Sequence, residues 1–394
     1  MAERRRTSAL AILAVAAACT PQPAPEVVSP AAAGSIAPNW ALVAGRPALT
    51  WWEPTGATGP PWRLRFARLD TSQSPVTIAE GGEYFANWAD FPSVVEAADG
   101  ALYAHWLEKV GSGTYAYGIQ MARSTDSGAG WQPLGLLHQD GTETEHGFVT
   151  LLPEGNGVRA VWLDGRETAT GGAMTLRTAL VDERVRTETE ERLDERICDC
   201  CSTAAVTTPD GPLVAYRDRG PTEIRDISLL RRSAAGWSAP AALHQDGWEI
   251  AGCPVNGPAL ATHGDTVWAA WFTAQGERPR VLAAVSADRG ASFGPPIEID
   301  SVAPLGRVGL ATAPDGAAHL SWLGTDGDTG VLRIVRLDAQ GRLGPVREVA
   351  RTPATRGSGV PRLLIHGGKI YLAWVHPGDK EKGEASRITL TQVD

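Results

Sequence analysis

Residues 91–106 read Phe91-Pro92-Ser93-Val94-Val95-Glu96-Ala97-Ala98-Asp99-Gly100-Ala101-Leu102-Tyr103-Ala104-His105-Trp106. Two short apolar runs flank Asp99-Gly100, a dipeptide that is typical of the tight turn between antiparallel strands. The second run ends at a large aromatic residue, Trp106. The stretch therefore predicts a strand, a turn and a second strand that carries an aromatic residue near its end.

An aromatic residue recurs at nearly one interval along the whole chain. The seven residues, 51 to 56 positions apart, are Trp52, Trp106, Trp162, Tyr216, Trp271, Trp322 and Trp374. The same strand-turn-strand pattern precedes them, with starts at Val149, Thr203, Pro258, Gly309 and Pro361. Two further short strands follow, as at Val281–Val285. Repeats of roughly 40 to 55 residues with four short strands each are typical of a β-propeller.

The period also sets the number of blades. The chain continues for 375 residues after Cys19, which predicts an all-β, seven-bladed propeller of four-stranded blades, with six blades as the alternative. The last repeat supplies only three strands and ends at Ser386–Val393, so we expect its fourth strand to come from the N-terminal side. Such ring closure removes the exposed sheet edges that invite aggregation.

The N-terminus reads as an export signal. Three arginines, Arg4 to Arg6, precede an apolar stretch from Thr7 to Ala18, which is shorter than the about 20 residues that span a bilayer. The run Val15–Cys19 resembles a bacterial lipoprotein cleavage box, although Ala16 stands where Leu is commoner. The resemblance implies a signal peptide over residues 1–18 and lipidation of Cys19, with an ordinary secretory signal as the alternative. We therefore expect an exported chain, anchored by lipid in the cell envelope and facing the periplasm or the cell surface.

The composition divides the rest of the chain into two parts. Residues 19–39 are rich in Pro and Ala and predict an extended tether, and residues 40–394 form the propeller domain. A net charge of −9 and a pI of about 5.5 argue against nucleic-acid binding, which needs a basic face. We expect a monomer that meets the membrane only through its anchor.

Two turns share the pattern Ser-x-Asp-x-Gly-x-x-aromatic. They contain Ser124, Asp126, Gly128 and Trp131 in one copy and Ser286, Asp288, Gly290 and Phe293 in the other. In each, Asp is suited to bond the turn amides, Gly to take a positive φ and the aromatic ring to pack between blades. These turns resemble the Asp-boxes, or BNR repeats, of the sialidase superfamily. The resemblance implies a sialidase-like fold, with the boxes on the face opposite the active site.

The candidate site residues gather in two kinds of loop. The loops that lead into the first strand of each blade (the leading loops) and the loops from the second to the third strand share one face of a propeller. The ligand-binding candidates in them are Arg166, Arg217, Arg219, Arg225, Asn256, Arg307 and Arg362. The catalytic candidates are the carboxylates Asp90, Asp164, Glu167 and Asp218. We expect Asp164, Arg166, Arg217, Arg219 and Arg225 to share one pocket beside the cysteines, although each is also suited to a structural ion pair.

The resemblance to sialidases does not reach their catalytic set. Sialidases bind the sugar carboxylate with three arginines, and they use a Tyr with a Glu partner as nucleophile and an Asp as acid/base. Their first arginine lies in an Arg-Ile-Pro step, and the matching step here is Asp90-Phe91-Pro92, which reverses the charge. Arg307 is the one arginine in the equivalent slot of the later repeats. Tyr216 occupies the repeat's aromatic position, which favours a core residue over a nucleophile.

Besides Cys19, the chain has four cysteines, Cys198, Cys200, Cys201 and Cys253. Cys198 and Cys253 lie at equivalent positions of adjacent repeats, so all four are expected to lie close together. In an oxidising compartment the pairing Cys198–Cys201 with Cys200–Cys253 is the least strained. A thiolate site for copper or zinc, with His146 or Asp199 nearby, and a redox-active site are the alternatives.

Three functions remain open on these grounds. The first is an exported, sialidase-like propeller that recognises an acidic carbohydrate and, as an exo-sialidase-like glycoside hydrolase, cleaves it. The second is a non-catalytic propeller that binds a glycan or an envelope protein on the same face. The third is an envelope metal-binding protein that uses the cysteine cluster.

Overall fold

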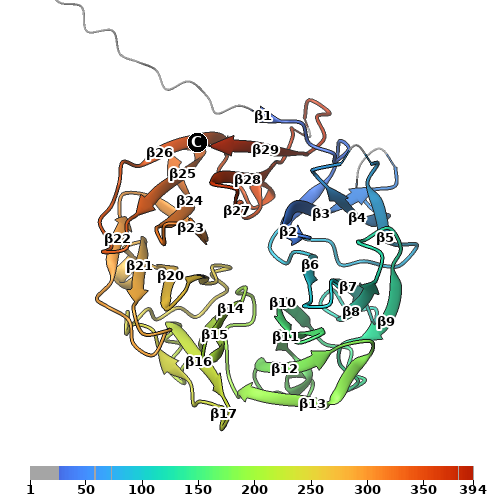
Figure 1. Cartoon of the computed structure of the whole chain (residues 1–394), viewed down its shortest axis with the longest axis horizontal. Coiled ribbons are helices and arrows are strands. Elements are labelled where there is room, and N and C mark those ends of the chain that lie inside the picture. The colour runs from blue at the N-terminus through green and yellow to red at the C-terminus, as the bar shows by residue number, and fades with distance from the viewer. Residues whose placement is uncertain (1–25, 57–58, 72, 380, 394) are drawn as a thin grey trace, which may run out of the picture.

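Seven blades surround a central axis in the computed structural model, which describes residues 26–56, 59–71, 73–379 and 381–393 (Figure 1). Each blade is an antiparallel sheet with its first strand nearest the axis, and in blades 1 to 6 the strands follow one another in chain order. The predicted seven-bladed, all-β propeller is therefore confirmed.

The first three blades are regular. Blade 1 contains β2 (Ile36–Val43), β3 (Arg46–Pro54), β4 (Trp62–Arg68) and β5 (Val76–Glu80). Blade 2 contains β6 (Ser93–Glu96), β7 (Leu102–Lys109), β8 (Tyr117–Ser124) and β9 (Gln132–Leu136). Blade 3 contains β10 (His146–Glu154), β11 (Gly157–Asp164), β12 (Thr175–Val181) and β13 (Val185–Asp194), with the 3-10 helix η1 (Arg166–Thr170) after β11.

The remaining blades complete the ring. Blade 4 contains β14 (Ala204–Thr208), β15 (Gly211–Arg217) and β16 (Ile227–Ser233), and its outer edge is split between β17 (Gly236–Trp237) and β18 (Ala241–Ala242). Blade 5 contains β19 (Ala259–His263), β20 (Thr266–Thr273), β21 (Arg280–Ser286) and β22 (Ile297–Asp300), with η2 (Gln275–Glu277). Blade 6 contains β23 (Pro304–Thr312), β24 (Ala318–Asp326), β25 (Thr329–Leu337) and β26 (Arg347–Pro353), and η3 (Arg356–Ser358) follows it. Blade 7 contains β27 (Arg362–His366), β28 (Lys369–His376) and β29 (Arg387–Val393).

The ring closes through its two ends, as expected. The short strand β1 (Glu26–Val27) pairs antiparallel with β29, with Val27 opposite Leu390, and supplies the fourth strand of blade 7 (Figure 1). The predicted tether of residues 19–39 therefore overlaps the propeller, since β1 lies within it and β2 begins at Ile36. The predicted signal peptide and Cys19 lie outside the described residues. Among the helices of the described ranges, none is long and apolar enough to cross a bilayer.

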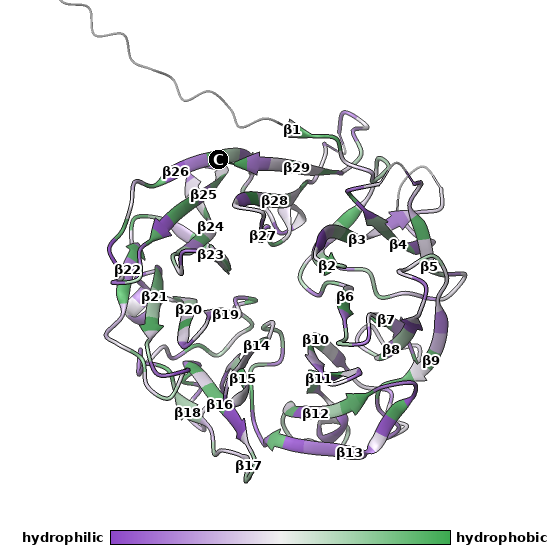
Figure 2. Ribbon diagram, in the orientation of Figure 1, coloured by the Kyte–Doolittle hydropathy of each residue, from purple (hydrophilic) through white to green (hydrophobic). Residues whose placement is uncertain are grey.

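The repeated aromatic residues form the core between blades. Trp162, for example, is fully buried and packs with Leu107 and Tyr117 of blade 2 and Val181 of blade 3. Tyr216 is equally buried, which fits the expected core position. Hydrophobic segments run along the strands of every blade (Figure 2). Each blade therefore buries its faces against its two neighbours, as the repeat required.

The two Ser-x-Asp-x-Gly turns lie between the third and fourth strands of blades 2 and 5. In the first, the Ser124 hydroxyl accepts the Gly128 amide at 3.0 Å, and Asp126 accepts the Gly130 amide at 2.8 Å. Gly128 has a φ of 88°, and a Cβ atom there would lie 2.4 Å from the Phe66 ring of blade 1. The glycine thus permits both the turn and the approach of the neighbouring blade.

Candidate functional site

A pocket of about 330 Å³ lies where the leading loops meet at one end of the axis. We call it the mouth pocket. Its lining includes residues from loops of blades 2, 3, 4, 5 and 7, namely Phe85, Asn87, Trp88, Tyr115, Tyr117, Glu145, Asp199, Cys200, Cys253 and Arg356. The leading loops and the second-to-third loop of blade 2 therefore share one face, as the repeat pattern predicts.

Aromatic rings form one wall of the mouth pocket. Phe85 and Tyr117 are stacked with ring centroids 4.1 Å apart, and Tyr115 meets Phe85 edge to face at 6.3 Å. Tyr115 is 62% exposed, so its ring is available to a ligand. Trp88 also lines the pocket. An exposed ring such as that of Tyr115 offers a flat apolar surface beside polar groups.

The polar groups of the pocket are of both signs. The Tyr117 hydroxyl donates a hydrogen bond to Glu145. Burial raises the pKa of the Glu145 carboxyl against the effect of that hydrogen bond, and the charge of Asp199 raises it further. The Arg356 side chain has no hydrogen-bond or ion-pair partner in the described part of the chain. The pocket therefore holds a carboxyl group with a raised pKa and an uncommitted cation.

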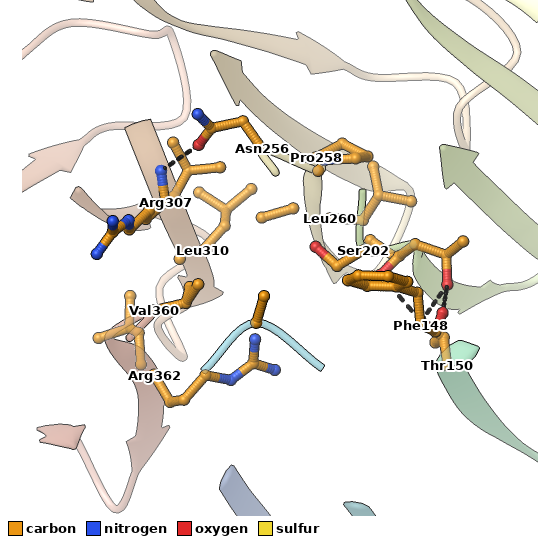
Figure 3. A pocket seen from close by; sticks show the side chains of 18 of the residues that line it. Phe148, Thr150, Ser202, Asn256, Pro258, Leu260, Arg307, Leu310, Val360 and Arg362 are labelled. Carbon is orange, nitrogen blue, oxygen red and sulfur yellow. Dashed lines mark hydrogen bonds between the residues drawn. The ribbon is translucent and has the colours of Figure 1, made fainter. Parts of the chain in front are cut away.

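A second cavity, of about 210 Å³, continues along the axis between the first strands of blades 3 to 7 (Figure 3). We call it the axial channel. Ala89, Phe148 and Val255 line both the channel and the mouth pocket, so the two are neighbours. Arg307 and Arg362 contribute the charges of the channel lining. A ligand in the mouth pocket therefore lies above a cationic channel.

Arg307 is held at the boundary between the two cavities. Its amide donates to the Asn256 side chain at 2.7 Å (Figure 3), and its guanidinium donates to the carbonyls of Gly359 at 2.7 Å and Thr355 at 3.1 Å. Burial lowers its pKa to about 10, and the charge of Arg356 contributes. Within the described residues Arg307 contacts no carboxylate.

Arg362, deeper in the channel, likewise contacts no carboxylate of the described chain. Its Nε donates to the Asn39 side chain at 2.9 Å, and its guanidinium lies 5.2 Å from the centroid of the Phe91 ring. Burial lowers its pKa to about 10. The ion pairs of the described chain include neither Arg307 nor Arg362. Buried cations without a counter-charge favour an anion that enters beside them.

Asp90 lies between blades 2 and 3 and lines neither cavity. Its Oδ2 accepts the Phe148 amide at 2.6 Å. Burial raises its pKa to about 7, and Glu145 adds to the effect while the Phe148 hydrogen bond opposes it. This candidate for catalysis is thus a buried group that joins two blades, close to Glu145 of the mouth pocket.

Asp164, Arg166 and Glu167 belong to an ion-pair network on blade 3. Asp164 accepts from the Arg166 guanidinium at 2.7 Å, and Glu167 lies 3.4 Å from Arg177. Two further residues in this network had no signal in the sequence, because their leading loop has no recognisable motif. They are His138 and Asp140, which join at 2.6 Å, with the His146 ring stacked on His138 at 3.7 Å.

The blade 3 network has the donor types of a metal site, since His138, Asp140 and His146 offer ligand atoms within 4.8 Å of one another. The carboxylates of this network, however, already form ion pairs with arginine. Arg166 contacts Asp140 at 3.6 Å and Glu190 at 2.7 Å. His138 also accepts the Ile119 amide at 3.4 Å through Nε2. These contacts make the network a structural element of blade 3.

Arg217, Arg219 and Arg225 form a separate group around Cys198. Arg217 is 1% exposed, and its guanidinium donates to the carbonyls of Asn256, Phe272 and Arg225. Arg219 pairs with Glu223 at 2.9 Å, and Asp218 accepts the Ser228 hydroxyl at 3.0 Å. The residues expected in one pocket are thus divided between the blade 3 network and this group, and most of their donors are already engaged.

The four cysteines lie together, as expected. Cys200 and Cys253 form a disulfide between the leading loops of blades 4 and 5. The sulfur atoms of Cys198 and Cys201 lie 2.7 Å apart, and both residues are buried. One of the two predicted disulfides is therefore present, and the second pair is aligned side by side.

No family model matches the chain, and no curated protein matches it. Among solved structures it is similar to an alpha-L-arabinanase of Penicillium chrysogenum complexed with arabinobiose (12% identity, 92% of this chain and 93% of that chain, TM-score 0.49). It is also similar to the Hadza microbial sialidase Hz136 (16%, 84% and 73%, TM-score 0.48). An ancestral GH74 enzyme matches with a TM-score of 0.58 at 13% identity over 92% of this chain, which spans about half (48%) of that chain. The last of these, with a TM-score above 0.5, is a likeness of fold alone.

Proposed function

We propose that the mouth pocket and the axial channel recognise an acidic carbohydrate. One observation carries the proposal: Arg307, Arg356 and Arg362 border these cavities without a carboxylate partner in the described chain, directly beside an aromatic wall. A sugar ring packs on exposed aromatic side chains, and a carboxylate or phosphate on that sugar would neutralise the arginines.

The dimensions and chemistry of the pocket support this ligand class. A volume of about 330 Å³ lies at the lower end of the range for small-ligand pockets, roughly 300 to 1,000 Å³. Asn87, Glu145 and Asp199 offer hydrogen-bond partners for sugar hydroxyls. Solved propellers similar in fold include sialidases and an arabinanase, which places carbohydrate ligands among the known uses of this architecture.

Hydrolysis is the second candidate function, and the Tyr117–Glu145 pair favours it. The Ser-x-Asp-x-Gly turns resemble the Asp-boxes of sialidases, and sialidases use a Tyr with a Glu partner. A hydrogen-bonded Tyr and Glu also border the mouth pocket here. Asp199 lines the pocket as well and supplies a second carboxylate. Tyr117 is buried, so catalysis through its hydroxyl requires an approach from the pocket side.

The N-terminal sequence gives the setting of this proposal. We infer from residues 1–19 that the chain is exported and carries lipid at Cys19. The propeller would then meet glycans of the envelope or of its surroundings, as a monomer on a membrane anchor.

Binding and turnover of defined sugars test the two candidates. In titration calorimetry, glucuronic acid and N-acetylneuraminic acid are expected to bind, and glucose and N-acetylmannosamine to bind at least tenfold more weakly. Release of methylumbelliferone from the matching glycosides would establish hydrolysis, whereas binding without release would establish a lectin-like propeller. Equal affinity for acidic and neutral sugars would overturn the proposal.

A further inference from the structure

A second chemical site lies behind the mouth pocket. Cys198 and Cys201 are each 1% exposed, and their sulfur atoms lie 2.7 Å apart. The sulfur of Cys200, which is bound to Cys253, lies 4.0 Å from that of Cys198. Two thiols therefore face each other next to a disulfide.

Two guanidinium groups, Arg217 and Arg225, flank this thiol pair, and Arg225 also pairs with Glu223 at 2.9 Å and with Asp199 at 3.8 Å. Arg225 donates from Nη1 to the Cys198 sulfur at 3.5 Å. Arg217 is fully buried, and its hydrogen-bond acceptors are neutral carbonyls. A buried guanidinium without a carboxylate needs a counter-charge, and a thiolate beside it supplies one.

The two sulfurs differ in protonation. Burial raises the pKa of Cys198, but the contact with Cys201, the Cys200 amide and the charges of Arg217 and Arg225 outweigh it and hold that pKa at about 7. Burial and the neighbouring Cys198 raise the pKa of Cys201. The pair thus combines a thiolate on Cys198 with a thiol on Cys201. The thiolate is the nucleophile of a first step, and the second sulfur can then close a disulfide.

Access restricts what reaches the pair. Cys200 and Cys253 line the mouth pocket, and the Cys200 sulfur lies 4.0 Å from the Cys198 sulfur. The Cys200 sulfur therefore separates the pocket from Cys198. Because Cys198 and Cys201 are buried and line neither the mouth pocket nor the axial channel, a protein partner cannot contact their sulfurs, and the reactant must be a small molecule. Hydrogen peroxide is such a molecule.

We propose that Cys198 and Cys201 are a peroxide-reactive dithiol site. This inference goes beyond carbohydrate recognition and does not rest on it. The Cys198 thiolate attacks one peroxide oxygen, the O–O bond breaks, and hydroxide leaves and takes up a proton as water. Cys198 becomes a sulfenic acid, and the Cys201 sulfur attacks it and forms the Cys198–Cys201 disulfide with release of a second water. Two thiols lose two electrons and two protons, and one peroxide is reduced to two waters.

A metal centre is the competing use of the same sulfurs, since Cys198, Cys200 and Cys201 lie within 4.8 Å of one another. Thiolates around a tetrahedral zinc ion at about 2.3 Å from the metal stand roughly 3.8 Å apart. The 2.7 Å between Cys198 and Cys201 is shorter than that, and Cys200 is engaged with Cys253. The geometry therefore favours bond formation between the sulfurs.

The test uses the folded full chain after mild reduction that leaves the Cys200–Cys253 disulfide intact. Thiol counting in denaturant is expected to give three thiols, those of Cys19, Cys198 and Cys201, or two where lipid occupies the Cys19 sulfur. One equivalent of hydrogen peroxide is expected to remove the thiols of Cys198 and Cys201. Peptide mapping should then link Cys198 to Cys201. The rate should rise with pH around a midpoint near 7, about 1.5 units below that of free cysteine.

Variants separate the two chemical steps. Cys201→Ser should trap a sulfenic acid on Cys198 that dimedone labels. Arg225→Leu should move the midpoint upward by about one pH unit or more, while Arg231→Leu, which removes an exposed ion pair with Asp210 on the same blade, should leave it in place. Intrinsic tryptophan fluorescence checks that each variant is folded.

Three results would overturn the proposal. One is a reaction whose pH midpoint equals that of free cysteine. Another is stoichiometric copper or zinc bound to the thiols of the purified protein, which would assign the cluster to a metal. The third is a Cys198–Cys201 disulfide that reductants reach only after unfolding, which would make it a structural crosslink.

Discussion

The guanidinium carbon of Arg307 lies 4.8 Å from the ring centroid of Trp88. Arg307 comes from the start of blade 6 and Trp88 from the leading loop of blade 2, so the contact spans the axis. Trp88 lines the mouth pocket and Arg307 the axial channel. The cation-π contact therefore forms the boundary between the cavities, and it presents a positive charge to any ligand that enters from the mouth.

Replacement of Arg307 by methionine tests this boundary. Arg307→Met keeps apolar bulk over Trp88 and removes the charge, so affinity for an acidic sugar should fall about tenfold, or about 1.4 kcal/mol. Affinity for a neutral sugar should change little. Arg342→Met, at an exposed ion pair with Asp338, is the matched control. Equal losses of affinity for the acidic and the neutral sugar would show that Arg307 shapes the pocket and does not bind the acid group.

Asp90 is expected to make stability depend on pH. Its folded pKa is about 7, whereas an unfolded Asp titrates at about 3.9. Because the folded value is the higher, the native state holds more protons between these values, and stability from this group is complete below about pH 4 and lost as the pH rises through about 7.

Asp90→Asn should remove that dependence, because an amide oxygen still accepts the Phe148 hydrogen bond and carries no charge. Urea unfolding from pH 5 to pH 8 should show a steeper loss of stability for the natural chain, by up to about 1.4 kcal/mol per pH unit. Parallel curves for the two proteins would contradict a raised pKa at Asp90.

The Cys200–Cys253 disulfide should stabilise the ring. It links two leading loops across a sequence separation of 53 residues. A Cys200→Ser, Cys253→Ser double variant should lose about 2–4 kcal/mol in urea unfolding, chiefly because the unfolded chain gains freedom. An unchanged midpoint would mean that the loops are held by their other contacts.

Gly128 should tolerate no side chain. Gly128→Ala imposes a positive φ on alanine and drives its Cβ against Phe66, which should cost roughly 2–5 kcal/mol. Gly100→Ala is the control: its φ is 82°, but no atom lies within 4 Å of its Cβ, so only the backbone cost of about 1–2 kcal/mol is expected. Similar losses of unfolding free energy in the two variants would show that the contact of Gly128 with Phe66 does not contribute.

The fold was predictable because one structural unit repeats. The spacing of Trp52 to Trp374 gave the blade number, and the short last repeat indicated closure by the N-terminal side, which β1 provides. Composition misled at one boundary: the stretch from Ile36 to Asn39 follows a Pro/Ala-rich segment yet begins β2, because strand pairing outweighs local composition.

The site was predictable only in part. Sequence separates residues by loop type, so Asn256, Arg307 and Arg362 were assigned to loops that lead into first strands. The structure places Asn256 ahead of β19, Arg307 within β23 and Arg362 at the start of β27, and all three line the channel. The cysteine cluster followed from repeat positions. Sequence carries no side-chain direction, and Arg217 turns inward to backbone carbonyls. Glu145 and Arg356 were missed as pocket residues. The role of Glu145 depends on its hydrogen bond with Tyr117, and that of Arg356 on the absence of a side-chain partner in the described chain.

The charge of Arg356 tests the central claim most directly, because Arg356 lines the mouth pocket and its side chain has no partner in the described ranges. Calorimetry would compare glucuronic acid with glucose on the natural chain, on Arg356→Gln and on the control Arg342→Gln. The account predicts a preference for the acid that Arg356→Gln reduces about tenfold and that Arg342→Gln leaves intact. A preference that is absent from the natural chain, or unchanged in Arg356→Gln, would contradict recognition of an acidic sugar at the mouth.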